Sequence, residues 1–149
     1  MAKELKTQIR IEASPAQVWA VLTDFEKYPD WNPFIKSLTG QVAVGKTIKA
    51  RLEPPGGNGM TFTPKVLAFE KNKEFRWLGN LFIKGLFDGE HRFELTDNGD
   101  GSTTLVQSEQ FAGILVPLFN KMIEVNTRNG FEAMNQKLKE RVEKEKKQS

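Results

Sequence analysis

The spacing of hydrophobic and polar positions changes along the chain, and each change predicts a new type of element. Residues 6–13 alternate between apolar and polar positions, which predicts a strand with one wet face. Ser14 and Pro15 then suit the N-cap and the first position of a helix. Apolar residues recur at helical spacing over residues 18–25, and the two prolines of residues 28–33 permit at most one further helical turn.

From residue 34 to residue 111 the pattern is almost entirely that of strands separated by turns. We predict strands at residues 35–40, 48–53, 61–71, 74–81, 87–97 and 102–111. The strongest turn sequence is PPGGNG at residues 54–59, and DNGDG at residues 97–101 is typical of a hairpin. Strongly twisted sheets tend to curl, so a sheet of this length would leave a space between itself and a helix packed on it.

The C-terminal part has one long amphipathic pattern. Apolar residues recur every three or four positions over residues 119–142, which predicts a single helix laid on the sheet. Gly130, in the middle of this helix, costs about 1 kcal/mol relative to Ala. It therefore indicates either a close approach to a strand or room for something beneath the helix. Residues 143–149 contain no apolar side chain, and we expect a solvated tail. The 149 residues suit a single α+β domain, 1–149.

The charge distribution argues against a nucleic-acid partner. The net charge is +3, but the segment from Lys137 onward holds six basic and three acidic residues, so the preceding part is neutral. No stretch approaches the roughly 20 apolar residues of a membrane span, so no stable membrane insertion is expected. The start of the chain lacks the apolar run of a secretory signal, and we expect a cytoplasmic protein.

The residue inventory restricts the possible chemistry. The absence of Cys excludes disulfides, a thiolate zinc site and a cysteine nucleophile. With His91 as the only histidine, no Cys and no carboxylate spaced to share a helix face with it, we expect no metal site. We also expect no cofactor.

Five segments carry a family resemblance. They are residues 13–19 (ASPAQVW), 28–34 (YPDWNPF), 75–79 (FRWLG), 89–93 (GEHRF) and 108–113 (SEQFAG). Together they resemble the polyketide cyclase/dehydrase-like group of the START/birch-pollen-allergen superfamily, also called SRPBCC. The resemblance covers essentially residues 9–138 and is specific for the fold, but members range from lipid carriers to cyclases and chaperone-ATPase activators.

The resemblance implies the helix-grip fold, in which a seven-stranded antiparallel sheet curls around the long C-terminal helix, with two short helices after the first strand. An apolar cavity separates the sheet from the helix in this fold. We expect the cavity to be touched by Trp31, Trp77, His91, Phe93, Met122, Ile123 and Asn126.

The implied topology also brings three connections to one edge of the sheet: residues 54–59, 81–87 and 112–117. The last two are apolar, although loops normally run over the surface and are polar. Two interpretations stay open, a cavity mouth for an apolar ligand or partner and a plug that closes the core. The mouth interpretation names Phe82, Ile83, Leu115 and Val116 as residues near the opening.

His91, Glu109 and Arg76 are the candidates for acid–base chemistry. His91 shares a face with Phe93 and should point inward, where a lone histidine is more often a hydrogen-bonded core residue than a catalyst. Glu109 points inward if Leu105 does and otherwise pairs at the surface. An inward carboxylate would need a partner, and His91 and Arg76 lie on neighbouring strands. These three are not a recognised catalytic set.

Three functions are compatible with these observations. The first is binding or transport of a small hydrophobic molecule such as a lipid, isoprenoid or polycyclic compound, which needs only an apolar cavity with a few polar anchors. The second is a cyclase/aromatase-like enzyme, which needs an acid or base beside the bound substrate. The third is a protein-interaction module like the chaperone-activator relatives. The oligomeric state stays open.

Overall fold

Strands and one long helical segment make up an α+β fold in the computed structural model, which describes residues 2–81 and 83–148. The strands in this part of the chain are β1 (Ala2–Ile11), β2 (Ile35–Thr39), β3 (Lys49–Leu52), β4 (Met60–Phe62), β5 (Lys65–Glu70), β6 (Glu74–Leu81), β7 (Phe87–Asp97) and β8 (Thr103–Ala112). The helical segments are α1 (Pro15–Leu22), η1 (Phe25–Lys27), α2 (Tyr28–Trp31), η2 (Val116–Phe119), α3 (Asn120–Met122), η3 (Ile123–Thr127) and α4 (Arg128–Gln148).

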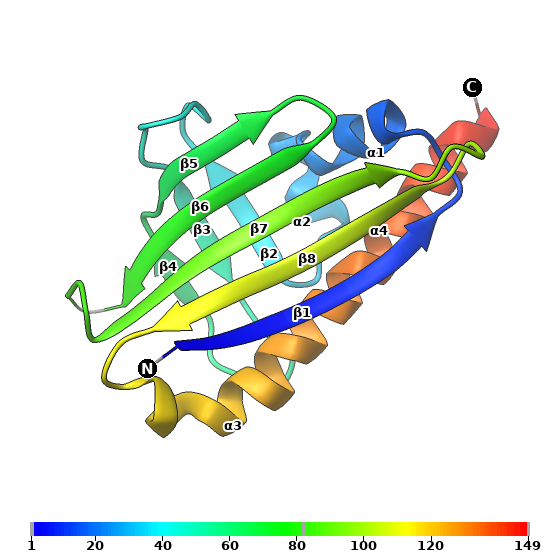
Figure 1. Cartoon of the computed structure of the whole chain (residues 1–149). Coiled ribbons are helices and arrows are strands. Elements are labelled where there is room, and N and C mark those ends of the chain that lie inside the picture. Colours follow the sequence, from blue (N-terminus) through cyan, green and yellow to red (C-terminus); the bar gives the residue numbers. More distant parts are fainter. Residues whose placement is uncertain (1, 82, 149) are drawn as a thin grey trace.

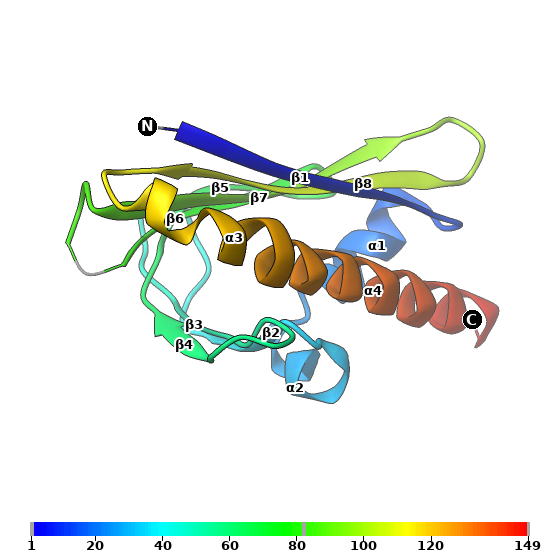
Figure 2. The ribbon, with the colours of Figure 1, turned by 90° about the horizontal axis from the view of Figure 1, so that it is seen from below.

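The strands form two antiparallel sheets that enclose the C-terminal helix. The larger sheet has the order β1-β8-β7-β6-β5, and the smaller has the order β2-β3-β4. Figure 1 shows the larger sheet in front of α4, and Figure 2 shows α4 running between the level of this sheet and that of β2–β4 and α2. The predicted helix gripped by a curled antiparallel sheet is confirmed.

The number of strands differs from the predicted seven because residues 61–71 are not one strand. Pro64 interrupts them, since proline has no N–H to donate to a ladder. The chain crosses between the sheets here: Ile48 N–H donates to the Pro64 carbonyl at 2.9 Å, and Val66 N–H donates to the Lys46 carbonyl at 2.9 Å. β4 therefore belongs to the smaller sheet and β5 to the larger one.

The two short helices lie where the sequence predicts them. Ser14 caps α1 through a reciprocal pair of hydrogen bonds with Gln17, and Pro15 is the first helical residue. The apolar face of α1 is buried, and the next helical turns end after Trp31. Tyr28 is fully buried and donates its hydroxyl proton to the Leu22 carbonyl. Burial raises the pKa of Tyr28 well above its usual range.

The C-terminal helical segment is irregular where it passes the open end of the sheet. It begins with the 3₁₀ turn η2, continues through α3 and the π-helical turn η3, and becomes a regular α-helix only at Arg128. A π turn bonds residue i to residue i+5, so it changes which side chains face the sheet.

No helix in residues 2–81 and 83–148 is long and apolar enough to span a membrane.

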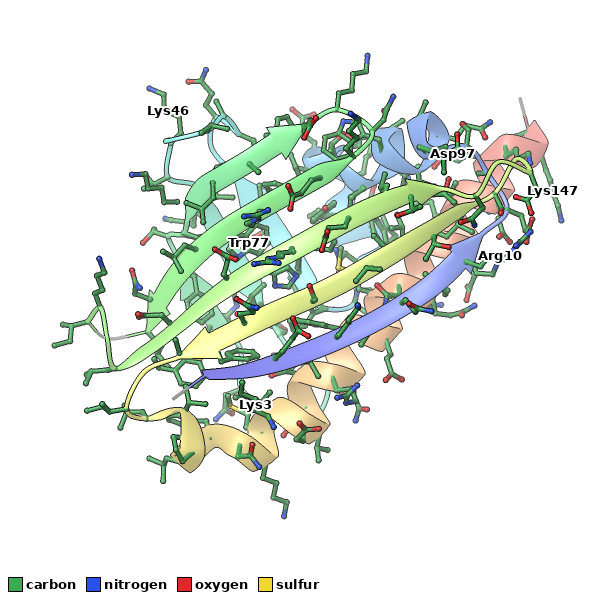
Figure 3. All side chains as sticks on the ribbon, in the orientation of Figure 1. Lys3, Arg10, Lys46, Trp77, Asp97 and Lys147 are labelled. Carbon is green, nitrogen blue, oxygen red and sulfur yellow. The ribbon has the colours of Figure 1, made fainter. Side chains whose placement is uncertain are left out.

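The segment predicted as a solvated tail continues α4 and contacts the end of β1. The Glu143 carboxylate accepts from the Glu12 N–H at 2.8 Å and from Lys139 at 2.6 Å, and Lys146 donates to the Glu12 carbonyl at 2.9 Å. Partial burial raises the pKa of Glu143, but the hydrogen bonds from Lys139 and from the Glu12 N–H outweigh it, so the pKa is lowered. Figure 3 places Arg10, Asp97 and Lys147 toward this same end of the molecule. Residues 144–148 are exposed, while Glu143 and Lys146 of the expected tail bond to the end of β1.

Gly130 gives the ring of Phe34 room beneath α4. A β-carbon at Gly130 would lie 2.5 Å from Cδ1 of Phe34, and both residues are buried. The ring of Phe34 also packs edge-on against Phe131, with ring centroids 5.5 Å apart. Of the two alternatives left open by the sequence, room beneath the helix is the one observed.

We expect Gly130→Ala to destabilise the protein, although Ala is the better helix former by about 1 kcal/mol. The added methyl group must displace the Phe34 ring, and overpacking of a core costs about 1–3 kcal/mol. Urea unfolding of Gly130→Ala, Phe34→Leu and the double variant would measure this. The Gly130→Ala cost should shrink in the Phe34→Leu background. An equal cost in both backgrounds would contradict the proposed clash.

Candidate functional site

A cavity of about 320 Å³ lies between the larger sheet, the smaller sheet and the helical segment. Gly57 and Asn58, in the turn between β3 and β4, line the cavity and are exposed, so it reaches the surface there. Asn126 holds this turn against the helix, because its side-chain amide donates to the Pro55 carbonyl at 3.0 Å.

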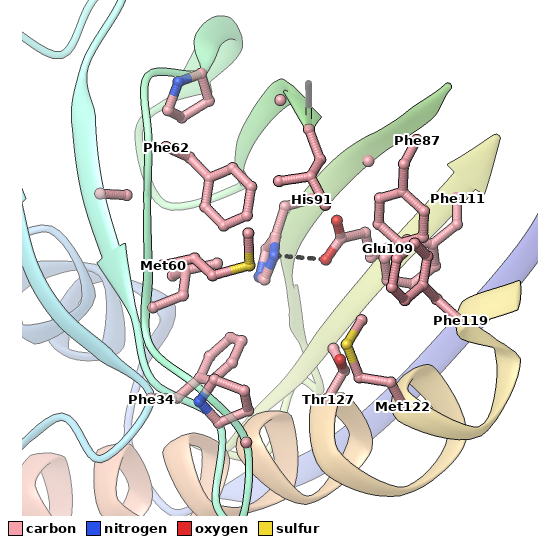
Figure 4. Close-up of a pocket in the computed structure, with 18 of the residues that line it drawn as sticks. Phe34, Met60, Phe62, Phe87, His91, Glu109, Phe111, Phe119, Met122 and Thr127 are labelled. Carbon is pink, nitrogen blue, oxygen red and sulfur yellow. Dashed lines mark hydrogen bonds and ion pairs between the residues drawn. The ribbon is translucent and has the colours of Figure 1, made fainter. Parts of the chain in front are cut away.

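The wall is apolar and rich in aromatic rings. Figure 4 shows Met60 and Phe62 of β4 on one side, and Phe87, Phe111 and Phe119 on the other. The polar side chains that line it in the described part of the chain are those of Asn58, His91, Glu109 and Thr127.

Three of the predicted cavity residues line the cavity: Trp77, His91 and Met122. Strand alternation places Trp77 and His91 on the inner face, directly opposite each other in the β6–β7 ladder. Met122 faces the cavity together with Thr127 rather than with Asn126. The π turn between them brings residues five apart to the same side, whereas the prediction assumed α-helical spacing.

The other four predicted residues lie outside the lining. Phe93 and Ile123 are fully buried in the core. Trp31 lies on α2 and packs edge-on against Tyr28, with ring centroids 5.4 Å apart. The side chain of Asn126 is engaged with the β3–β4 turn.

The predicted mouth is only partly as expected. Phe82 lies outside the described residues. Ile83 is 67% exposed, but Val116 is 3% exposed and Leu115 packs against the core. Val116 turns inward because the two connections are tied together: Ile114 N–H donates to the Gly85 carbonyl and Leu115 N–H to the Leu86 carbonyl. The two end residues of the first connection, Leu81 and Phe87, line the cavity instead, and so does Phe119 just beyond the second connection.

Glu109 points inward and contacts His91, which resolves the orientation that the sequence left open. The two residues are directly opposite in the β7–β8 ladder, and Nδ1 of His91 lies 3.2 Å from Oε1 of Glu109. The His91 side chain is completely buried among the rings of Trp77, Phe93 and Phe131, whereas the Glu109 side chain is 14% exposed. Glu109 therefore presents its carboxyl group to the cavity beside His91, which also lines it.

Arg76 is not part of this group. It occupies the outer face of the sheet, opposite Arg92, and pairs with Glu74. The alternation of Phe75 and Trp77 inward already requires Arg76 to point outward.

Within the described residues, no three His, Asp or Glu side chains are placed to hold a metal ion.

A buried chain of hydrogen bonds continues from His91 to the helix and the first strand. Nε2 of His91 lies 3.0 Å from Oε1 of Gln107, whose Nε2 donates to Oδ1 of Asn135 at 2.7 Å and to the Phe131 carbonyl at 3.4 Å. Nδ2 of Asn135 donates to the Thr7 hydroxyl at 2.9 Å, and this hydroxyl donates to the Gln107 carbonyl at 2.9 Å.

The direction of this chain determines where His91 carries a proton. The backbone carbonyl of Gln107 can only accept a hydrogen bond, so the Thr7 hydroxyl donates its single proton to it. The Thr7 hydroxyl must therefore accept from the Asn135 amide. The amide of Asn135 therefore turns its oxygen to Gln107, and the Phe131 carbonyl likewise requires the Gln107 NH₂ group on that side. Oε1 of Gln107 then faces His91, so Nε2 of His91 carries a proton.

We expect nuclear magnetic resonance to find a proton on Nε2 of His91. Because this is the only histidine of the chain, its ¹⁵N-labelled ring signals can be assigned directly. The proton on Nε2 should persist in Glu109→Gln. In Gln107→Leu, the ring form protonated on Nε2 should no longer be the dominant one. A ring with a bare Nε2 in the unaltered protein would contradict the direction of the chain.

The fold and the cavity agree with the comparisons with known proteins. The chain matches the family described as polyketide cyclase/dehydrase and lipid transport over residues 2–143, so it belongs to this family. No curated protein matches the chain.

Solved structures share the fold at low sequence identity. The Zhui aromatase/cyclase from Streptomyces sp. R1128 superposes with a TM-score of 0.77 at 14% identity, covering 96% of this chain and 94% of that one. A norcoclaurine synthase point mutant from Thalictrum flavum gives 0.74 at 16% identity, covering 98% and 97%. A START superfamily protein from Mycobacterium smegmatis gives 0.72 at 22% identity, covering 95% and 97%.

Proposed function

We propose that this protein binds a small hydrophobic molecule in the cavity between its sheets and its C-terminal helix. The observation that carries this proposal is the cavity itself, about 320 Å³ with a wall made mainly of apolar side chains. Its volume falls in the range of small-molecule sites, which combine apolar walls with a few polar groups.

The packing around the cavity supports a pre-formed site. Trp77 and His91 are held with ring centroids 4.8 Å apart, and Phe34 is fixed under α4 by Gly130. A ligand entering such a site would not need to order its walls, which lowers the cost of binding. The family description includes lipid transport, and one structural neighbour, a norcoclaurine synthase, has been solved with dopamine and hydroxybenzaldehyde.

Filling the cavity should weaken the binding of an apolar probe. Thr127 lines the cavity from the helix, so the ring of Thr127→Trp would occupy the ligand volume. We expect at least a tenfold weaker affinity for an uncharged polycyclic fluorophore, measured by fluorescence titration.

Asn129→Trp provides the matched control, because Asn129 lies two residues further along, at the start of α4, and is exposed. This variant should bind the probe like the unaltered protein. Equal binding by all three proteins would show that the probe does not use the cavity and would count against the proposal.

A second candidate is an acid–base enzyme of the cyclase/dehydrase kind, favoured by the contact between His91 and Glu109 at the cavity wall. General acid–base catalysis contributes about 10²–10⁴-fold to a rate. An enzyme of this kind would lose at least a hundredfold in turnover in Glu109→Met while still binding its substrate. Turnover that is unchanged in this variant would reject the assignment of Glu109.

A further inference from the structure

Only one of the two carboxyl oxygens of Glu109 is engaged. Oε1 contacts His91, whereas Oε2 has no hydrogen-bond partner among residues 2–81 and 83–148. Oε2 lies over Gly89, where a β-carbon would overlap it. Both residues line the cavity, and Figure 4 shows the carboxyl group directed into it. The missing side chain of Gly89 thus leaves the space that Oε2 occupies.

The proton on Nε2 of His91 determines the hydrogen-bonding character of Oε2. With Nε2 protonated, a neutral ring would present a bare Nδ1, which cannot face a bare carboxylate oxygen at 3.2 Å without repulsion. The contact between Nδ1 and Oε1 therefore contains a proton, carried either by an imidazolium or by a carboxylic acid. In both forms the pair has no net charge and Oε2 has no proton, so Oε2 can only accept a hydrogen bond.

We propose that the ligand is a neutral apolar molecule carrying a hydroxyl or N–H group that donates a hydrogen bond to Oε2 of Glu109. This proposal rests on the proposed binding function and specifies its ligand class. It disfavours anionic lipids such as fatty acids, because the described lining contains Glu109 but no Lys or Arg. An anionic head group would meet an oxygen that cannot donate to it.

Three two-ring probes of nearly equal shape separate binding from recognition. 1-Naphthol offers a hydroxyl donor, 1-methylnaphthalene replaces it with a methyl group, and 1-methoxynaphthalene retains only an acceptor. Dissociation constants are measured for the unaltered protein and for each variant, and the methylnaphthalene-to-naphthol ratio is compared between proteins. Comparing ratios cancels the different hydration of the probes.

We expect the ratio to fall by about tenfold in Glu109→Met, the size expected for losing one hydrogen bond to a buried acceptor. Gly89→Ala, which displaces Oε2 while keeping Glu109, should give a similar fall. Glu109→Gln should preserve most of the ratio, because its NH₂ group can donate to Nδ1 and leave its oxygen free as the acceptor. Glu90→Met, on the outer face of β7, is the matched control and should leave the ratio unchanged.

The outcomes distinguish the two proposals. If none of the three probes binds the unaltered protein, both the binding function and the ligand class are overturned. If 1-methylnaphthalene binds but the ratio is the same in Glu109→Met and Gly89→Ala, the binding function stands and the ligand class is wrong. The role of Oε2 as the acceptor would also be overturned if the methoxynaphthalene-to-naphthol ratio stayed unchanged in both variants. Tight binding of the anion 1-naphthoate would overturn it as well.

Discussion

The backbone carbonyls of Gln107 and Phe131 can only accept hydrogen bonds, and the polar interior is oriented by this constraint. Thr7, Asn135 and Gln107 come from β1, α4 and β8, so one chain of hydrogen bonds ties the first strand, the helix and the last strand together. All three side chains are buried, and leaving one partner unsatisfied costs about 1–3 kcal/mol. The same chain ends at His91, and it thereby connects the packing of the helix to the protonation of the cavity wall.

A carboxyl group in an apolar cavity is costly unless its charge is compensated. Glu109 meets this condition through His91, whose Nδ1 lies 3.2 Å from Oε1 of Glu109. The rings of Trp77, Phe93 and Phe131 surround the imidazole, whose two nitrogens contact Glu109 and Gln107. The cavity can therefore remain apolar over most of its surface and still offer one polar oxygen.

Strand alternation is strong enough in this sequence to predict the inner face of β6 and β7, including Trp77 and His91. It also predicts that Arg76, between Phe75 and Trp77, points outward. Arg76 was nevertheless a candidate partner for Glu109 because of the strand on which it lies. The orientation of Glu109 itself depended on the register of β8 against β7, which alternation alone does not supply. The π turn before α4 depends on backbone geometry that side-chain spacing does not encode, so Asn126 was expected where Thr127 lies.

The same geometry supports the proposed binding function more than the proposed acid–base enzyme. Acid–base chemistry on a bound molecule generally needs one group that gives a proton and another that takes one. His91 and Glu109 contact each other, with Nδ1 and Oε1 3.2 Å apart, and so lie together on one side of the cavity. The remaining polar side chains of the described lining are Asn58 and Thr127, whose amide and hydroxyl groups neither gain nor lose a proton near neutral pH. We therefore prefer the proposal that this wall holds a donor-bearing ligand, with Glu109 as its acceptor.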